Sequence, residues 1–310
     1  MIVTLDVFSG RPNPSWTLSE KEARQLTDRV ASRALPAAAG VEGILGFRGF
    51  VVHGPGDDTA KKAALPDSFR VGGLLSGEFV APEGVAASAL RVEEADDAAK
   101  WLLTTARGEV EDEVLRYVEG ALKEPAQQRE GPAGKKGGKG AEPAEDAQDE
   151  KALAEAKKAG VVLAACVIAN TAYNPGFWNV PAVQPHNNCY NYSMNYRSDT
   201  FAQPGRISGH PNNVMQCANV ATAANWDGCK ALCSGSNKNV ALVIWPGVDY
   251  HWYRKHSNGF WGHKPGSTAA RNTDNSGKVI GGVLTPANCN RGPYTIFCGY
   301  RFSPTGMKVK

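Results

Sequence analysis

The alternation of apolar and polar positions predicts a small α+β domain in residues 1–123. An amphipathic helix follows the first strand, and Ser19 with Glu22 three residues later forms a capping-box pattern at its start. The predicted elements are strands at 2–8, 46–53 and within 69–80, and helices at 19–30, 96–104 and 110–122. No nucleophile–base pattern occurs in this region, so we expect a pro-, targeting or docking domain.

The pattern from residue 153 to 310 predicts helices followed by an antiparallel sheet. The predicted helices are 187–196 and one capped by Asn212 or Asn213, and the predicted strands are 240–245, 249–256, 260–264 and 294–302. Asn258 and Gly259 predict a two-residue hairpin turn between two of these strands. That register places His251 and His263 on opposite faces of the hairpin.

A segment rich in Pro, Gly, Ala, Lys and Glu separates the two patterned regions at residues 124–152. It holds too few apolar residues to offset the entropy of ordering a chain, so we expect it to be disordered and easily cleaved by proteases. The chain is thus predicted to be an α+β protein with an N-terminal domain at 1–123, this linker, and a C-terminal domain at 153–310.

Charge is divided unevenly along the 310 residues, although their net charge is only +3. The C-terminal domain holds 15 Lys and Arg residues against 5 Asp and Glu residues, a difference of +10, which favours an anionic partner or surface. The sequence contains no apolar run of transmembrane length, no secretory signal and no Gly-rich nucleotide motif. We therefore expect no membrane span and no cofactor, and a chain that is cytoplasmic or exported by a non-classical route.

All seven cysteines lie in the C-terminal domain. Their odd number leaves at least one thiol unpaired, and two close pairs, Cys229 with Cys233 and Cys289 with Cys298, are candidates for disulfides if the protein is exported. Nearby histidines make a zinc site an alternative. Because neither a C-x2-C pair nor an HExxH motif is present, we predict no metal.

Cys189 is the candidate nucleophile, because it follows two asparagines at a predicted helix N-terminus. There the helix dipole and free backbone N–H groups would stabilise a thiolate and lower the thiol pKa. His251, at the start of a predicted strand, is the candidate base, and His263 is its alternate. A third group would orient the imidazole. The candidates for that role are Asp274, Asn272 and Asn275.

The order of a Cys at a helix start, a His on a later strand and then an Asp or Asn resembles that of papain-like thiol hydrolases, including the NlpC/P60 and CHAP-type branches. The resemblance covers residues 184–302 and contains no signature stretch. It implies that Cys189 attacks an acyl carbon, that His251 protonates the leaving amine, and that Gln184 helps to stabilise the oxyanion. The substrate would be a peptide, peptidoglycan or a protein. The opening DVFSGRPNP is similar to the N-termini of bacterial proteins, which suggests a bacterial source.

A module that binds without catalysis is the rival hypothesis, because 5 of the 7 Trp and 8 of the 9 Tyr residues lie after residue 153. Side chains such as Trp252, Tyr253 and Trp261 suit contact with a substrate, or with a glycan or anionic surface in a non-catalytic or toxin-like protein. Geometry separates the two hypotheses. A sulfur within about 4 Å of an imidazole favours the hydrolase, whereas a Cys189 buried against apolar side chains favours the binding module.

Overall fold

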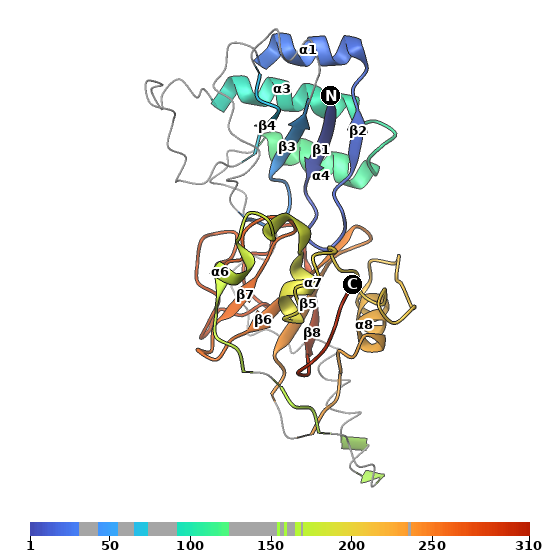
Figure 1. The fold of residues 1–310 in the computed structure, drawn as a ribbon, viewed down its shortest axis with the longest axis vertical. Coiled ribbons are helices and arrows are strands. Elements are labelled where there is room, and N and C mark those ends of the chain that lie inside the picture. Colours follow the sequence, from blue (N-terminus) through green and yellow to red (C-terminus); the bar gives the residue numbers. More distant parts are fainter. Residues whose placement is uncertain are drawn as a thin grey trace. The chain divides into compact units, whose positions relative to one another are not determined.

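The computed structural model describes residues 1–30, 43–54, 65–73, 92–123, 154–155, 158–159, 165–168, 170–234 and 237–310. They form two compact units, each with helices and its own antiparallel sheet, so the predicted α+β class is confirmed (Figure 1). The first unit comprises residues 1–7, 13–42 and 47–129, and the second comprises 8–12, 43–46 and 130–310. The linker predicted at 124–152 lies outside the described residues.

The first unit is built on a four-stranded sheet with the strand order β2-β1-β3-β4 (Figure 1). Its strands are β1 (Ile2–Asp6), β2 (Ser15–Thr17), β3 (Gly49–His53) and β4 (Ser68–Val71), and its helices are α1 (Glu20–Val30), α3 (Val92–Thr105) and α4 (Asp112–Lys123). Helix α3 contacts α1, α4, β3 and β4, and apolar side chains such as Leu5, Phe50 and Leu102 are fully buried in this core. Strand β2 has three residues, too few for an alternating pattern, and is missing from the predicted elements.

Helix α1 begins with the capping box that the sequence predicts. The Ser19 hydroxyl lies 2.7 Å from a carboxylate oxygen of Glu22, and the Glu22 backbone N–H donates to the Ser19 hydroxyl at 3.3 Å. The Ser19 backbone N–H donates to the same carboxylate at 2.8 Å. These hydrogen bonds lower the pKa of Glu22. Local chemistry alone therefore fixes this helix start.

A buried ion cluster lies inside the sheet of the first unit. The Asp6 carboxylate is 2.7 Å from the Arg48 guanidinium and 3.0 Å from that of Arg70, and all three side chains are buried. Burial by itself would raise the pKa of Asp6, but the two guanidinium groups outweigh it and hold that pKa below its ordinary value. The carboxylate is thus kept ionised, and its loss would leave two buried cations without a counter-charge.

The second unit carries a four-stranded antiparallel sheet with the order β7-β6-β5-β8 (Figure 1). Its strands are β5 (Val240–Trp245), β6 (Asp249–Lys255), β7 (Trp261–His263) and β8 (Ile296–Arg301), and its helices are α6 (Pro175–Trp178), η4 (Gln184–His186), α7 (Cys189–Ser193) and α8 (Cys217–Trp226). Helix α7 packs on β6 and α8 packs on β5. Every residue of β5 is buried, as its continuous apolar run predicts for a central strand.

The register of the β6–β7 hairpin differs from the predicted one by one residue. The pairs are Tyr253 with His263 and Lys255 with Trp261. The two-residue turn predicted at Asn258 and Gly259 is in fact a wider loop that spans 256–260 and closes where the His256 N–H donates to the carbonyl of Phe260. Because side chains alternate along a strand, this slip moves His263 onto the same face as His251.

Two helices of the second unit are shorter than predicted. Helix α7 has five residues, and Asn188 caps it by accepting backbone N–H groups at its start. Helix α8 begins at Cys217, and neither Asn212 nor Asn213 caps it. The Asn212 side chain instead bonds to both backbone groups of Val214 and forms a local turn. Asparagine thus marks a true cap in one place and a turn in the other.

Two short segments of the predicted N-terminal domain, residues 8–12 and 43–46, belong to the second unit. Asn275 holds the second segment, because its side-chain amide makes two hydrogen bonds of 2.8 Å with the backbone of Leu45. In the first segment, the backbone of Gly10 lies so close to the Tyr250 ring that an added Cβ would overlap it. Glycine is therefore needed at that position by close approach.

The disulfides join cysteines that lie far apart in the sequence. Cys166 is bonded to Cys233 and Cys217 to Cys298, with Cα atoms 5.5 and 5.3 Å apart. The two pairs predicted from close spacing are therefore wrong, because the fold, and not the sequence separation, brings the sulfur atoms together. The remaining thiols are free and buried; they are Cys189, Cys229 and Cys289.

Candidate functional site

The β6–β7 face of the second unit carries a chain of hydrogen bonds that joins a hydroxyl to two imidazoles. The Ser9 hydroxyl lies 2.5 Å from His251 Nδ1, and His251 Nε2 lies 2.9 Å from His263 Nδ1. His263 Nε2 in turn lies 2.8 Å from the carbonyl oxygen of Thr273. All three side chains in this relay are buried.

The direction of the relay follows from its last acceptor. A carbonyl oxygen only accepts, so His263 Nε2 donates to Thr273. Burial lowers the pKa of His263 to about 3, which keeps its imidazole neutral with an unprotonated Nδ1. That nitrogen accepts from His251 Nε2–H, and the Ser9 hydroxyl is the hydrogen-bond partner of His251 Nδ1. His263 thus orients His251, the role that a third group has in hydrolytic triads.

Asp249 anchors the turn that carries Ser9. Its buried carboxylate accepts backbone N–H groups from Ser9 at 2.6 Å, Gly10 at 3.1 Å and Arg11 at 2.9 Å. It also accepts the Tyr294 hydroxyl at 2.5 Å. Burial raises the pKa of Asp249, and these four hydrogen bonds oppose that effect. The sequence analysis identified neither Ser9 nor Tyr294 as a site residue.

Three donors from the second unit also meet the carbonyl oxygen of Gly10. The side-chain amides of Asn188 and Gln203 both donate to it at 2.8 Å, and the Tyr250 hydroxyl donates at 3.2 Å. The N–H groups of the turn therefore bond to Asp249, and its Gly10 carbonyl bonds to the three donors named above. These hydrogen bonds make residues 8–12 an integral part of the second unit.

Cys189 begins α7 but lacks the properties of a nucleophile. Its side chain is fully buried in the apolar core, and its sulfur lies 4.0 Å from the carbonyl oxygen of Tyr250. Burial raises the thiol pKa, and the negative charge of Asp249 raises it further, while the Ser9 hydroxyl opposes the shift. The prediction of a lowered pKa is wrong, because a five-residue helix cannot offset this loss of hydration.

His251, the predicted partner of Cys189, forms hydrogen bonds with Ser9 and His263 instead. Among the described residues, the Cys189 thiol makes no hydrogen bond to a histidine, and the Ser9 hydroxyl occupies His251 Nδ1 instead. The predicted thiolate–imidazole pair is therefore absent from this part of the chain. Sequence reasoning predicted the helix and the strand, but it did not foresee that the distant Ser9 would bond to the imidazole.

The predicted orienting and oxyanion residues have other partners. Asp274 accepts the backbone N–H groups of Ser276, Lys278 and Asn290, as an Asx-type turn does. Asn275 bonds to Leu45, and the backbone carbonyl of Asn272 accepts from Ile280. The Gln184 side chain donates to the Ser267 carbonyl at 3.3 Å. In this structure His263, the predicted alternate base, takes the orienting position.

The predicted contact aromatics divide between the core and one surface groove. Trp252 and Tyr253 have no exposed surface, so neither can meet a substrate. Trp261 is 5% exposed and lines a groove of about 620 Å³ together with Lys238, Lys255, Phe260 and Tyr300. This groove brings aromatic and basic side chains together at the surface of the second unit.

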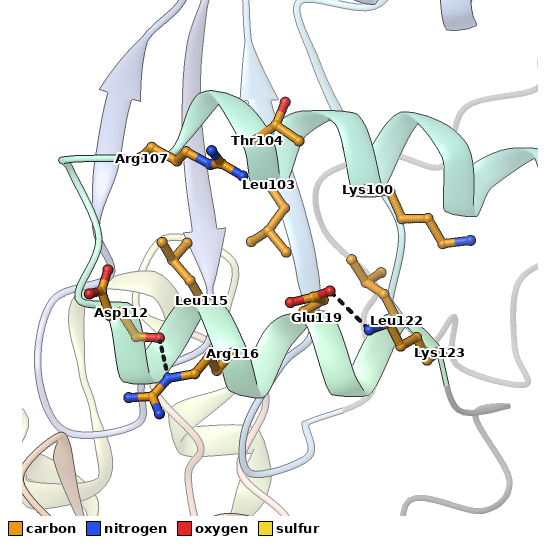
Figure 2. Close-up of a pocket in the computed structure, with 10 residues that line it drawn as sticks. All are labelled: Lys100, Leu103, Thr104, Arg107, Asp112, Leu115, Arg116, Glu119, Leu122 and Lys123. Carbon is orange, nitrogen blue, oxygen red and sulfur yellow. Dashed lines mark hydrogen bonds and ion pairs between the residues drawn. The ribbon is translucent and has the colours of Figure 1, made fainter.

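The first unit has a groove of its own, of about 600 Å³, between helices α3 and α4 (Figure 2). Leu103 and Leu115 point into the space between the helices (Figure 2). Charged side chains of both signs surround them, including the exposed pair of Glu119 and Lys123 at 2.9 Å. Because exposed pairs of this kind contribute little and the charges are mixed, no particular ligand chemistry follows from this groove.

Neither a metal site nor a membrane span is found where the structure describes the chain. No three His, Cys, Asp or Glu side chains of the described residues gather closely enough to hold a metal ion. No helix in the described ranges is both long and apolar enough to cross a membrane.

Comparison with known proteins gives one informative relation. No family model matches the sequence, and no solved structure matches it. Insoluble matrix shell protein 1 from the mollusc Ruditapes philippinarum is 44% identical to the chain over 136 residues, which make up 43% of this chain and 90% of the relative. A mollusc shell matrix protein among the relatives contradicts the assignment of the chain to bacterial thiol proteases, so that assignment is withdrawn.

Proposed function

The chain belongs to the family of insoluble matrix shell protein 1, and from this premise we propose that it is a non-catalytic component of an insoluble matrix. Its second unit would act as a disulfide-stabilised module that binds a glycan or an anionic surface. The matched region is 43% of the chain. The proposed binding role is placed in the second unit because of its disulfides and basic charge, and the first unit is left a docking or targeting role.

The proposal rests mainly on the burial of the Cys189 thiol, which has no contact with solvent. A thiol attacks an acyl carbon only as an accessible thiolate. Here the thiol is fully buried, its pKa is raised, and the hydroxyl of Ser9 rather than the thiol bonds to His251. A substrate could reach the sulfur only by opening the apolar core that surrounds it, which favours a structural role for this cysteine.

The disulfides and the charge of the second unit agree with a place in a matrix. Disulfides such as Cys166–Cys233 and Cys217–Cys298 form and persist in oxidising compartments, including the extracellular space. The excess of 15 basic over 5 acidic residues between 153 and 310 suits an anionic polymer. The cysteine hydrolase expected from the order of elements stays a prediction, which the following measurement tests.

In the folded chain we expect Cys189 to react with iodoacetamide roughly a hundredfold more slowly than an exposed cysteine, because burial blocks access and keeps the thiol protonated. The rate would be followed by mass spectrometry of the full chain at about pH 6 and about pH 8. The matched control is Ser257→Cys, which places a thiol in the exposed loop after β6.

Denaturant should bring both cysteines to the same rate and so show that the fold protects Cys189. Labelling of Cys189 that is faster than labelling of Ser257→Cys at the lower pH would instead reveal an ion-paired thiolate. That result would overturn the non-catalytic proposal and restore the hydrolase.

A further inference from the structure

The groove of about 620 Å³ in the second unit is lined by residues of the β6–β7 hairpin and by Tyr300 of β8. Trp261 and Tyr300 form its floor, with ring centroids 5.4 Å apart and planes tilted by 31°. Phe260 stands at its edge with 40% of its surface exposed. Phe260 thus gives the groove an exposed apolar surface, and Asn258 and Thr285 are polar residues that also line it.

The Phe260 ring is held in place by its close approach to a glycine. A Cβ added to Gly281 would overlap the ring, so the ring rests directly on that backbone. An exposed phenylalanine normally samples several rotamers, and this packing restricts it. A partner that stacks on a ring held in this way loses less entropy on binding.

The charges of the groove have one sign. Lys255 lies with its ammonium group 6.0 Å from the centroid of the Trp261 ring, and Lys238 lines the same groove. No Asp or Glu is among the described residues that line it. Lysines over an aromatic floor combine attraction for anions with stacking on a flat or ring-shaped partner.

We propose that this groove binds an acidic polysaccharide, a sugar chain that carries carboxylate or sulfate groups. The inference rests on the proposed matrix function and names the ligand class of that module. Sugar rings would pack on Phe260 and Tyr300, while Lys238 and Lys255 would pair with the acidic groups. The groove holds two lysines and not a long row of basic residues. Two lysines match a polymer whose charges are far apart better than a nucleic acid, whose backbone charges are closely spaced.

Binding of the full chain to polygalacturonate and to chondroitin sulfate would test the proposal, with dextran as the neutral probe. The Lys238→Glu/Lys255→Glu double variant is expected to weaken binding to both acidic polymers about tenfold or more. Phe260→Ala should weaken it about fivefold through the loss of stacking. The matched controls are Lys308→Glu, which changes an exposed lysine elsewhere, and Phe177→Ala, which removes a ring with 46% exposure.

Controls that weaken binding as much as the groove variants would show that net charge alone attracts the polymer, and the groove would be discarded. Binding of dextran as tight as that of the acidic polymers would also overturn the proposal. Binding of polyuridylate that is tighter and displaces both acidic polymers would overturn it in favour of single-stranded nucleic acid. All substituted groove residues except Lys238 are well exposed, and equal thermal midpoints would confirm that each variant folds. If the groove variants bind the polymers like the wild type and Cys189 labels slowly, only the groove proposal is rejected. If Cys189 labels rapidly, the proposed function itself is rejected.

Discussion

The Asp249→Asn variant is expected to release the turn at residues 8–12 from the second unit. The carboxylate accepts three backbone N–H groups and one hydroxyl, and the new amide would turn an N–H toward one or more of these donors and break their hydrogen bonds. Leaving such groups unsatisfied costs about 1–3 kcal/mol each, so we expect a loss of roughly 3 kcal/mol or more. Hydrogen exchange at the amides of Ser9, Gly10 and Arg11 would measure it directly.

Asp274→Asn is the matched control for this experiment. Asp274 is also buried and also accepts three backbone N–H groups, but from Ser276, Lys278 and Asn290. It should lower the stability of the second unit by a similar amount while the amides at 9–11 stay as protected as the rest of the unit. Unchanged protection at 9–11 in Asp249→Asn would mean that the other anchors, such as Asn188 on the Gly10 carbonyl, suffice to hold the turn.

The turn also shows where sequence reasoning reaches its limit. Features that depend on neighbours in the chain were predictable, such as the Ser19–Glu22 capping box and the fully apolar run of β5. The cysteine at the start of α7 and the histidine on β6 were predictable for the same reason. Each of these follows from residue types within one helix or strand.

The arrangement of the site was not predictable in this way. Ser9 bonds to His251 across 242 positions of sequence, and no local pattern links the two. The hairpin register depended on whether the loop held two or five residues, and that single difference decided whether His263 faces His251. Disulfide partners were equally hidden, because close spacing of Cys229 and Cys233 says nothing about distances in the fold.

The second large effect is expected in the first unit, where Asp6→Asn would remove the counter-charge of two buried guanidinium groups. Arg48 and Arg70 lie 2.7 and 3.0 Å from this carboxylate, and breaking a buried ion pair from one side typically costs about 3–5 kcal/mol. Hydrogen exchange of the peptides that contain β1 and β3 would report the loss, since it separates the first unit from the second.

The dependence on pH distinguishes this electrostatic cause from a simple packing defect. The folded-state pKa of Asp6 lies below its unfolded value, so the stability it contributes is fully present above the unfolded value of about 4 and is lost as pH falls through the folded value. The wild-type first unit should therefore lose protection in acid, while Asp6→Asn should be weaker at neutral pH and less sensitive to acid. Glu119→Gln, which alters an exposed carboxylate beside Lys123, should leave both protection and acid response nearly unchanged. An Asp6→Asn variant with the same acid response as the wild type would assign the acid sensitivity to other carboxylates and refute the role given to this cluster.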